Sequence, residues 1–308
     1  MITALGGGVG AAKFLEGLSS VIGDESLNVI VNTGDDINLY GLNISPDVDT
    51  VIYRLSGSID KTKGWGIGDD TFHTLKTLER FGEETWFNIG DKDFATHLYR
   101  TYLKKSGLSP TDITSRIAGA YGVKGNIKIL PMTDQDVETW IVTDEGEMHF
   151  QEYLVKRRMR PEVIKVIVKN IERAEPAPGV ISSIENSRGI ILCPSNPIIS
   201  IGPILNIDGI KKALKTTHAK IVAISPLIKG APLKGPADKL MKGIGLEVSS
   251  VQVARLYRDF LDIMVIDTKD SPEAGQILDM GVEPLVVDTL MSDPDKAASL
   301  ASSVLGQL

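Results

Sequence analysis

Short apolar segments rich in β-branched residues recur along this chain, each followed by glycine or small polar residues and then by helical spacing. The segments are continuously apolar rather than alternating, which is typical of strands that a parallel sheet buries on both faces. We expect seven strands, at residues 2–5, 27–31, 127–130, 189–193, 219–224, 263–267 and 283–287. The pattern therefore predicts an α/β fold with a Rossmann-like parallel sheet sandwiched by helices.

Residues 69–122 depart from this alternation of strands and helices. Apolar side chains recur there at intervals of three and four residues, most clearly over 71–78 and 95–103, as in amphipathic helices. We interpret 69–122 as a helical insertion or subdomain within one α/β domain that spans residues 1–308. A closing helix is expected over 294–305.

The composition favours small-molecule ligands. With 33 Lys+Arg against 40 Asp+Glu, the net charge is −7 and no long basic tract is present, which argues against binding to nucleic acid. A single cysteine, Cys193, excludes an intrachain disulfide and fits a reducing cytoplasm. The longest uncharged stretch, 189–207, contains three prolines, so we expect no membrane span. The sequence leaves a homodimer open.

The first expected strand runs into a glycine-rich turn, Gly6-Gly7-Gly8-Val9-Gly10, and then into a helix that contains Lys13. Glycines allow close backbone approach, and the first amides of a helix favour anions. Gly6, Gly8 and Ala11 satisfy the dinucleotide fingerprint G-x-G-x-x-[G/A], which is weak evidence on its own, and Ala12 before Lys13 and Phe14 after it exclude a Walker A loop. Phosphate or nucleotide contact is favoured over a tight turn that binds nothing.

Acidic residues cluster after the second expected strand. Ser45 and Pro46 are typical of a helix start and Gly57 of a helix end, which places two aspartates in the first helical turn. Such aspartates can simply complement the helix dipole. Carboxylates at the carboxyl end of a parallel strand also suit Mg²⁺ bound together with phosphate. The candidate metal ligands are Asp35, Asp36, Asp47 and Asp49.

Two rigid loops supply further polar groups. Prolines bracket Ser195 and Asn196 directly after the strand at 189–193 and fix a loop that offers hydroxyl, amide and backbone donors, either for phosphate contact or as a plain strand-to-helix turn. The segment 224–238 is also rich in proline and glycine, and its Lys229 and Lys234 are placed to reach phosphate. The four histidines show no metal-binding spacing, and we expect surface or structural roles for them.

Four of these segments together resemble the 2-phospho-L-lactate transferase family, which acts in the biosynthesis of the deazaflavin coenzyme F(420). The resemblance rests on residues 6–13, 32–36, 41–50 and 194–197, and the Asp-rich block is its most specific part. It implies transfer of a phospholactyl group from lactyl-2-diphospho-5'-guanosine to 7,8-didemethyl-8-hydroxy-5-deazariboflavin, with release of GMP and a requirement for Mg²⁺. The choice between a lactyl and an enolpyruvyl donor stays open.

The resemblance also implies roles for individual residues. Asp49 and Asn88 would contact the deazaflavin, and Asp49 and Asp36 would be catalytic. An acid that is hydrogen-bonded to the attacking hydroxyl can act as its general base. The residues expected to bind nucleotide or phosphate are Gly7, Gly8, Gly10, Lys13, Thr33, Gly34, Ser195 and Asn196.

Two alternatives remain. The first is a non-catalytic regulator of the same fold that binds a nucleotide-sugar, but in such proteins the Asp-rich turn continues into glycine and serine, whereas Ile37 follows Asp36 here. The second is a nicotinamide-dependent oxidoreductase, which would place one acid directly at the tip of the second strand. A polar turn intervenes before Asp35, which weakens this alternative.

Overall fold

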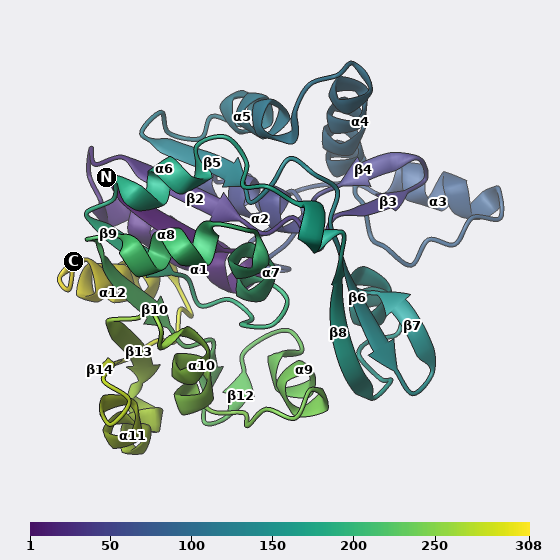
Figure 1. The fold of residues 1–308 in the computed structure, drawn as a ribbon. Coiled ribbons are helices and arrows are strands. Elements are labelled where there is room, and N and C mark those ends of the chain that lie inside the picture. Colours follow the sequence, from purple (N-terminus) through teal and green to yellow (C-terminus); the bar gives the residue numbers. More distant parts are fainter.

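The computed structural model describes residues 1–308 and contains a central sheet of seven parallel strands covered by helices on both faces (Figure 1). All seven strands expected from the apolar pattern are present, with ends shifted by at most one residue. They are β1 (Ile2–Gly6), β2 (Leu27–Val31), β5 (Ile127–Pro131), β9 (Gly189–Leu192), β10 (Lys220–Ile224), β13 (Ile263–Asp267) and β14 (Glu283–Val287). The fold is α/β.

The strand order is β14-β13-β10-β9-β1-β2-β5, so the chain winds outward from β1 in one direction and then outward from β9 in the other. This is the order of a doubly wound Rossmann-like sheet, and its topological switch point lies between β1 and β9. Loops leave these two strands toward opposite faces of the sheet, which opens a crevice beyond their carboxyl ends. The ligand site is therefore expected above β1 and β9.

Two hydrophobic cores of similar size, 34 and 33 buried residues, occupy the two faces of the sheet. Neighbouring residues of one strand contribute to opposite cores: Ala4 of β1 belongs to the first core and Leu5 to the second. The first core packs under α1 (Gly8–Val21), α2 (Pro46–Leu55), α5 (Pro110–Ala120) and α12 (Pro294–Leu305). The second packs under α6 (Val180–Glu185), α7 (Ile201–Asn206), α8 (Ile210–Thr216), α10 (Ser250–Tyr257) and α11 (Ala274–Leu278). Burial on both faces explains why the strands are continuously apolar.

Residues 69–122 contain the helices that their spacing predicts. These are α3 (His73–Arg80), α4 (Asp91–Lys105) and α5, of which α4 packs on the short strand β4 (Leu42–Ile44) and α5 on the sheet's edge strand β5. The expected closing helix is α12. None of the helices combines the length and the apolar character that crossing a bilayer requires.

The sequence pattern did not predict three smaller β elements. They are the hairpin of β3 (Ile37–Leu39) and β4 (Leu42–Ile44), the antiparallel sheet of β6 (Glu138–Thr143), β7 (Gly146–His149) and β8 (Val163–Lys169), and the pair β11 (Leu227–Ile228) and β12 (Ala231–Pro232). Figure 1 shows the hairpin, α3 and the β6–β8 sheet on the same side of the central sheet. The helix α9 (Ala237–Gly243) packs against β8.

Candidate active site

A cleft of about 690 Å³ lies at the switch point of the central sheet. The loops after β1, β2, β9 and β10 and the start of α2 all contribute to its walls, so it occupies the carboxyl edge of the sheet. Of the residues expected at a site, the cleft is lined by Gly7, Gly8, Gly10, Lys13, Asp35, Asp47, Asp49, Asn88, Ser195 and Asn196. The fold thus brings together segments that lie nearly 190 residues apart in the sequence.

Glycines in the turn after β1 permit two close approaches. A Cβ atom on Gly7 would lie 2.0 Å from Asp47 Oδ2, and one on Gly10 would lie 2.2 Å from the carbonyl oxygen of Pro194. Gly8 opens α1 with a φ of +74°, a conformation that favours glycine. The turn therefore needs glycine to pack against its own neighbours as well as to leave room for a ligand.

The loop after β9 is fixed to the glycine turn. The amide of Gly7 donates to Ser195 Oγ (3.2 Å), and Ser195 Oγ lies 3.1 Å from the carbonyl oxygen of Gly7, to which it donates. Asn196 Oδ1 accepts from the amide of Ile198 (2.9 Å), whereas its buried Nδ2 group has no partner. Because buried donors are nearly always paired in native proteins, this amide is available to an acceptor on a ligand.

Cationic side chains gather beside the glycine turn. Lys13 Nζ donates to the carbonyl oxygen of Met291 (3.1 Å), and both Lys13 and Lys234 line the cleft. Burial, together with the positive charges of Lys234 and Arg54, lowers the pKa of Lys13. Mutual repulsion among these cations favours binding of an anion at this end of the cleft.

Asp35 and Asp47 are buried carboxylates that form no ion pair. Their exposed fractions are 3% and 7%, and Asp47 Oδ2 accepts from Asn32 Nδ2 at 2.9 Å. Burial raises the pKa of Asp47 to about 6, and burial with the nearby charge of Asp47 raises the pKa of Asp35 well above its usual range. Asp35 Oδ1 has no hydrogen-bond partner. Two desolvated carboxylates with an unpaired oxygen fit a divalent cation with oxygen ligands.

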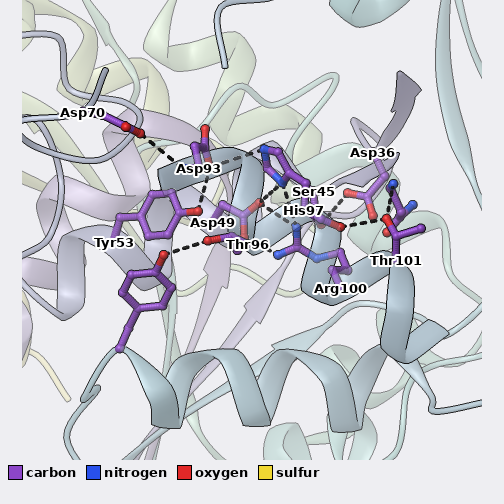
Figure 2. A network of polar contacts seen from close by, with 12 residues as sticks. Asp36, Ser45, Asp49, Tyr53, Asp70, Asp93, Thr96, His97, Arg100 and Thr101 are labelled. Atoms are coloured by element: carbon purple, nitrogen blue, oxygen red, sulfur yellow. Dashed lines mark hydrogen bonds and ion pairs between the residues drawn. The ribbon is translucent and has the colours of Figure 1, made fainter. Parts of the chain in front are cut away.

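Asp49 is in a different environment from this pair. It lies in the first turn of α2, and Arg100 of α4 binds both of its carboxylate oxygens, with Nη1 2.9 Å from Oδ2 and Nη2 paired to Oδ1 (Figure 2). Both residues are buried. The charge of Asp49 is therefore already balanced by a guanidinium group, and a cation is less favourable there than at Asp35 and Asp47.

The structure does not bring Thr33, Gly34 and Asp36 into the cleft. Asp36 accepts from Ser45 Oγ (2.6 Å) and lines a smaller polar cavity of about 100 Å³ together with Thr33. Gly34 lies against Thr139, whose amide donates to the carbonyl oxygen of Gly34 (2.6 Å). Burial raises the pKa of Asp36 to about 8, although the hydrogen bond from Ser45 opposes this shift.

Helix α2 begins where the sequence predicts. Ser45 is the N-cap, Pro46 is the first helical residue, and Gly57 follows the end of the helix with a φ of +74°. The Ser45 hydroxyl makes no cap bond to the helix backbone and donates to Asp36 instead. The start of α2 is therefore tied to the loop that carries the acidic residues.

The sequence pattern missed a polar stripe on α4. Asp93, His97 and Arg100 lie on one face of this helix and meet Asp49 and Tyr53 of α2 (Figure 2). Tyr53 donates from its hydroxyl to Asp93 Oδ1 (2.7 Å), and His97 Nε2 lies 3.3 Å from the same oxygen. Burial alone would raise the pKa of Asp93, but hydrogen bonds from His97 and Tyr53 and the nearby positive charges lower it overall.

The spacing of these polar residues in the sequence could have predicted that they share one face of α4. Positions 93, 97 and 100 recur every three or four residues, as the apolar positions of an amphipathic helix do. We assigned His97 to the surface or to a structural role from sequence, and the structure places it buried in the wall of the cleft.

Comparison with known proteins identifies relatives over nearly the whole chain. A family model described as 2-phospho-L-lactate transferase CofD matches residues 2–300. The 2-phospho-L-lactate transferase of Methanosarcina mazei is 42% identical over 299 residues, which cover 97% of each chain. The phosphoenolpyruvate transferase of Streptomyces griseus is 38% identical over 310 residues, which cover 99% of this chain and 97% of the relative.

Among solved structures, protein BH3568 of Bacillus halodurans matches with a TM-score of 0.66. The match covers 99% of this chain and 98% of that one at 16% identity. At this identity the likeness shows a shared fold and carries no argument about chemistry.

Proposed function

The chain belongs to the 2-phospho-L-lactate transferase CofD family, and we propose that it makes the phosphodiester of a deazaflavin in the biosynthesis of coenzyme F(420). In this proposal the donor is lactyl-2-diphospho-5'-guanosine, the acceptor is 7,8-didemethyl-8-hydroxy-5-deazariboflavin, and GMP leaves. The family makes the chain a transferase; the proposal concerns its donor, its acceptor and its metal.

One observation carries the proposal: the same cleft is lined by donors for phosphate and by apolar aromatic side chains. Lys13, the glycine turn and the unpaired amide of Asn196 supply donors for a diphosphate. Trp65, Phe87 and other apolar side chains line the same cleft and suit a flat aromatic ring. A volume of about 690 Å³ falls in the range of pockets that hold small-molecule ligands.

We assign Mg²⁺ to Asp35 and Asp47. These two carboxylates are buried, face the cleft and lack any cationic partner, whereas Asp49 is paired with Arg100 and Asp36 lies outside the cleft. When bound, a divalent cation neutralises charge on phosphate oxygens and polarises the phosphorus. Donor binding should therefore weaken in EDTA, and full affinity for GDP without a divalent cation would contradict this assignment.

The chain's own residues orient the two substrates. The terminal ribityl hydroxyl of the deazaflavin would form a new bond to the phosphorus that bears the lactyl group, while the bond from that phosphorus to the bridging oxygen breaks. The bridging oxygen keeps the electron pair and leaves with GMP. In this proposal Asp49 accepts the hydroxyl proton, and Asn88, which is exposed and lines the cleft, holds the ribityl chain.

In this proposal the donor's three-carbon group is lactyl rather than enolpyruvyl. Relatives of similar length bear two names, 2-phospho-L-lactate transferase at 42% identity and phosphoenolpyruvate transferase at 38%. The somewhat higher identity supports the lactyl donor. Parallel assays with a lactyl and an enolpyruvyl donor distinguish the two.

The test is mass detection of the phospholactyl deazaflavin formed by purified protein, Mg²⁺ and both substrates. We expect the product and GMP in equal amounts, loss of both in Asp35→Asn, and normal turnover in Asp208→Asn, which makes the same change at an exposed site outside the cleft. Absence of product with either donor would refute the proposal. Stabilisation by NAD⁺ or by a uridine nucleotide-sugar, without any by GDP plus Mg²⁺, would favour one of the two alternatives.

A further inference from the structure

Helices α2 and α4 share a buried polar network that forms one wall of the cleft. Asp49 and Tyr53 extend from α2, and Asp93, His97 and Arg100 extend from α4 (Figure 2). Four of these five residues line the cleft, whereas Arg100 lines only the small cavity behind them. Arg100 therefore contacts the cleft through its neighbours rather than directly.

The guanidinium of Arg100 fixes the plane of the Asp49 carboxylate. Its two terminal nitrogens bind the two oxygens of Asp49 side by side, the bidentate geometry that best defines a carboxylate's orientation. Arg100 is 5% exposed and Asp49 3%, so water does not compete strongly for these bonds.

His97 contacts Arg100 through one ring nitrogen and lies close to Asp93 through the other. Its Nδ1 lies 3.2 Å from Arg100 Nη1, and because arginine only donates, Nδ1 must accept. The ring N–H then resides on Nε2, which lies 3.3 Å from Asp93 Oδ1. The ring therefore lies between Arg100 and Asp93.

Each oxygen of Asp49 can still accept a second hydrogen bond, because a carboxylate oxygen has two lone pairs. With one pair on each oxygen directed to Arg100, the remaining acceptor positions determine where a substrate hydroxyl can sit. Small rotations of this carboxylate would change the direction of attack on the phosphorus.

We propose that Arg100 is a positioning residue for the transfer reaction, which holds Asp49 in the orientation that accepts the attacking hydroxyl. The inference rests on the proposed function, since it assumes that Asp49 receives the acceptor hydroxyl. It predicts a defect in the use of the deazaflavin and none in the binding of nucleotide. The groups proposed to bind the nucleotide's phosphates lie elsewhere, at the glycine turn and at Asn196.

The variants that test this role are Arg100→Ala and Arg100→Lys, with Arg116→Ala as the matched control. Arg116 is an exposed arginine of the neighbouring helix α5 and forms no ion pair. We expect Arg100→Ala to lower kcat about 100-fold, the scale of a misplaced reacting group, while the Kd of GDP with Mg²⁺ stays within twofold. Arg100→Lys keeps the charge without the bidentate geometry, so its kcat should also fall, by about 10-fold or more.

Chemical rescue distinguishes positioning from a merely structural role. Guanidinium at low millimolar concentration should restore at least about a tenth of the lost activity of Arg100→Ala, whereas methylammonium should not, because it lacks the planar fork. In the double variant with Asp49→Asn, the loss should be no larger than in Asp49→Asn alone, since the two residues act as one unit.

Three results would overturn the proposal. They are a kcat of Arg100→Ala and Arg100→Lys within threefold of the wild type, a parallel loss of GDP affinity, and rescue by methylammonium as effective as by guanidinium. If Arg100→Ala does not fold, as a missing thermal transition would show, the lysine variant provides the test through its kcat and its GDP affinity.

A separate readout distinguishes failure of this inference from failure of the proposed function. If the wild type forms no product with either donor, the proposed function fails. Binding of the deazaflavin alone, followed by calorimetry, still tests Arg100: its alanine variant should bind more weakly than Arg116→Ala, and equal affinities would refute the positioning role.

Discussion

Replacing Asp47 by asparagine should stabilise the metal-free protein at pH 8, although the change removes a carboxylate from the candidate active site. Asp47 is 7% exposed and forms no ion pair, and its hydrogen bonds from Asn32 and Gly8 only partly offset its burial. Burial raises the pKa of this carboxyl from 3.8 to about 6. The folded protein therefore resists ionising a group that ionises freely in the unfolded chain.

The sign and size of the change in folding stability follow from this shift in the pKa of Asp47. A group whose pKa is raised by folding contributes its full stability below the unfolded value of 3.8 and loses it as the pH rises through about 6. Two pKa units at about 1.4 kcal/mol each amount to about 3 kcal/mol at pH 8. Asparagine carries no charge and avoids this loss, so the gain should be about 3 kcal/mol at pH 8 and only about 1 kcal/mol at pH 4.5.

The measurement is urea and thermal unfolding in EDTA at these two pH values. For a chain of 308 residues, 3 kcal/mol corresponds to a rise in Tm of about 5 °C. Asp208→Asn, an exposed control, should change neither transition. Adding Mg²⁺ at pH 8 should stabilise the wild type much more than Asp47→Asn. A destabilised Asp47→Asn at pH 8, or an equal gain at both pH values, would refute the reasoning.

Gly10→Ala should destabilise the protein by about 1–3 kcal/mol in urea unfolding and weaken GDP binding, because the new Cβ would lie 2.2 Å from the carbonyl oxygen of Pro194. Gly119→Ala, on α5 with open space around its Cβ position, is the control and should not destabilise. Asn196→Ala should raise the Kd of GDP about 10-fold in calorimetry through loss of one hydrogen bond, and an unchanged Kd would remove Asn196 from the phosphate site. Asp36→Asn should reduce the fall in Tm between pH 5 and pH 9, because burial raises the pKa of Asp36 to about 8 and the wild type loses stability as the pH rises through that value.

The central sheet and most of the helices could be predicted from the sequence because their signals are local. A strand buried on both faces is apolar throughout, and a helix beside the sheet repeats its apolar residues every three or four positions. The start of α2 could be predicted for the same reason, since its N-cap Ser45 and its first helical residue Pro46 are adjacent in the chain. The β3–β4 hairpin and the β6–β8 sheet were not predicted, because their strands are short or only half buried and alternate with polar residues.

Only part of the candidate site could be predicted from the sequence. The glycine turn, Ser195 and Asn196 could be predicted as one phosphate-binding region because parallel strands end at the same edge of a sheet, and the structure places all of them around one cleft. Asp35 and Asp36 could not be separated by sequence. They are adjacent in one turn, but the first lines the cleft and the second lines the small cavity behind it.

The sequence by itself therefore determined which segments become strands and helices, the order in which they alternate, and the set of acidic and glycine residues from which a site could be built. Only the tertiary structure decided which charges are balanced. Asp49 is paired with Arg100, 51 residues later in the chain, whereas Asp35 and Asp47 have no cation. The physical reason is that the energy of a buried charge depends on what lies within a few ångströms of it, and the position of α4 relative to α2 sets the distance from Asp49 to Arg100.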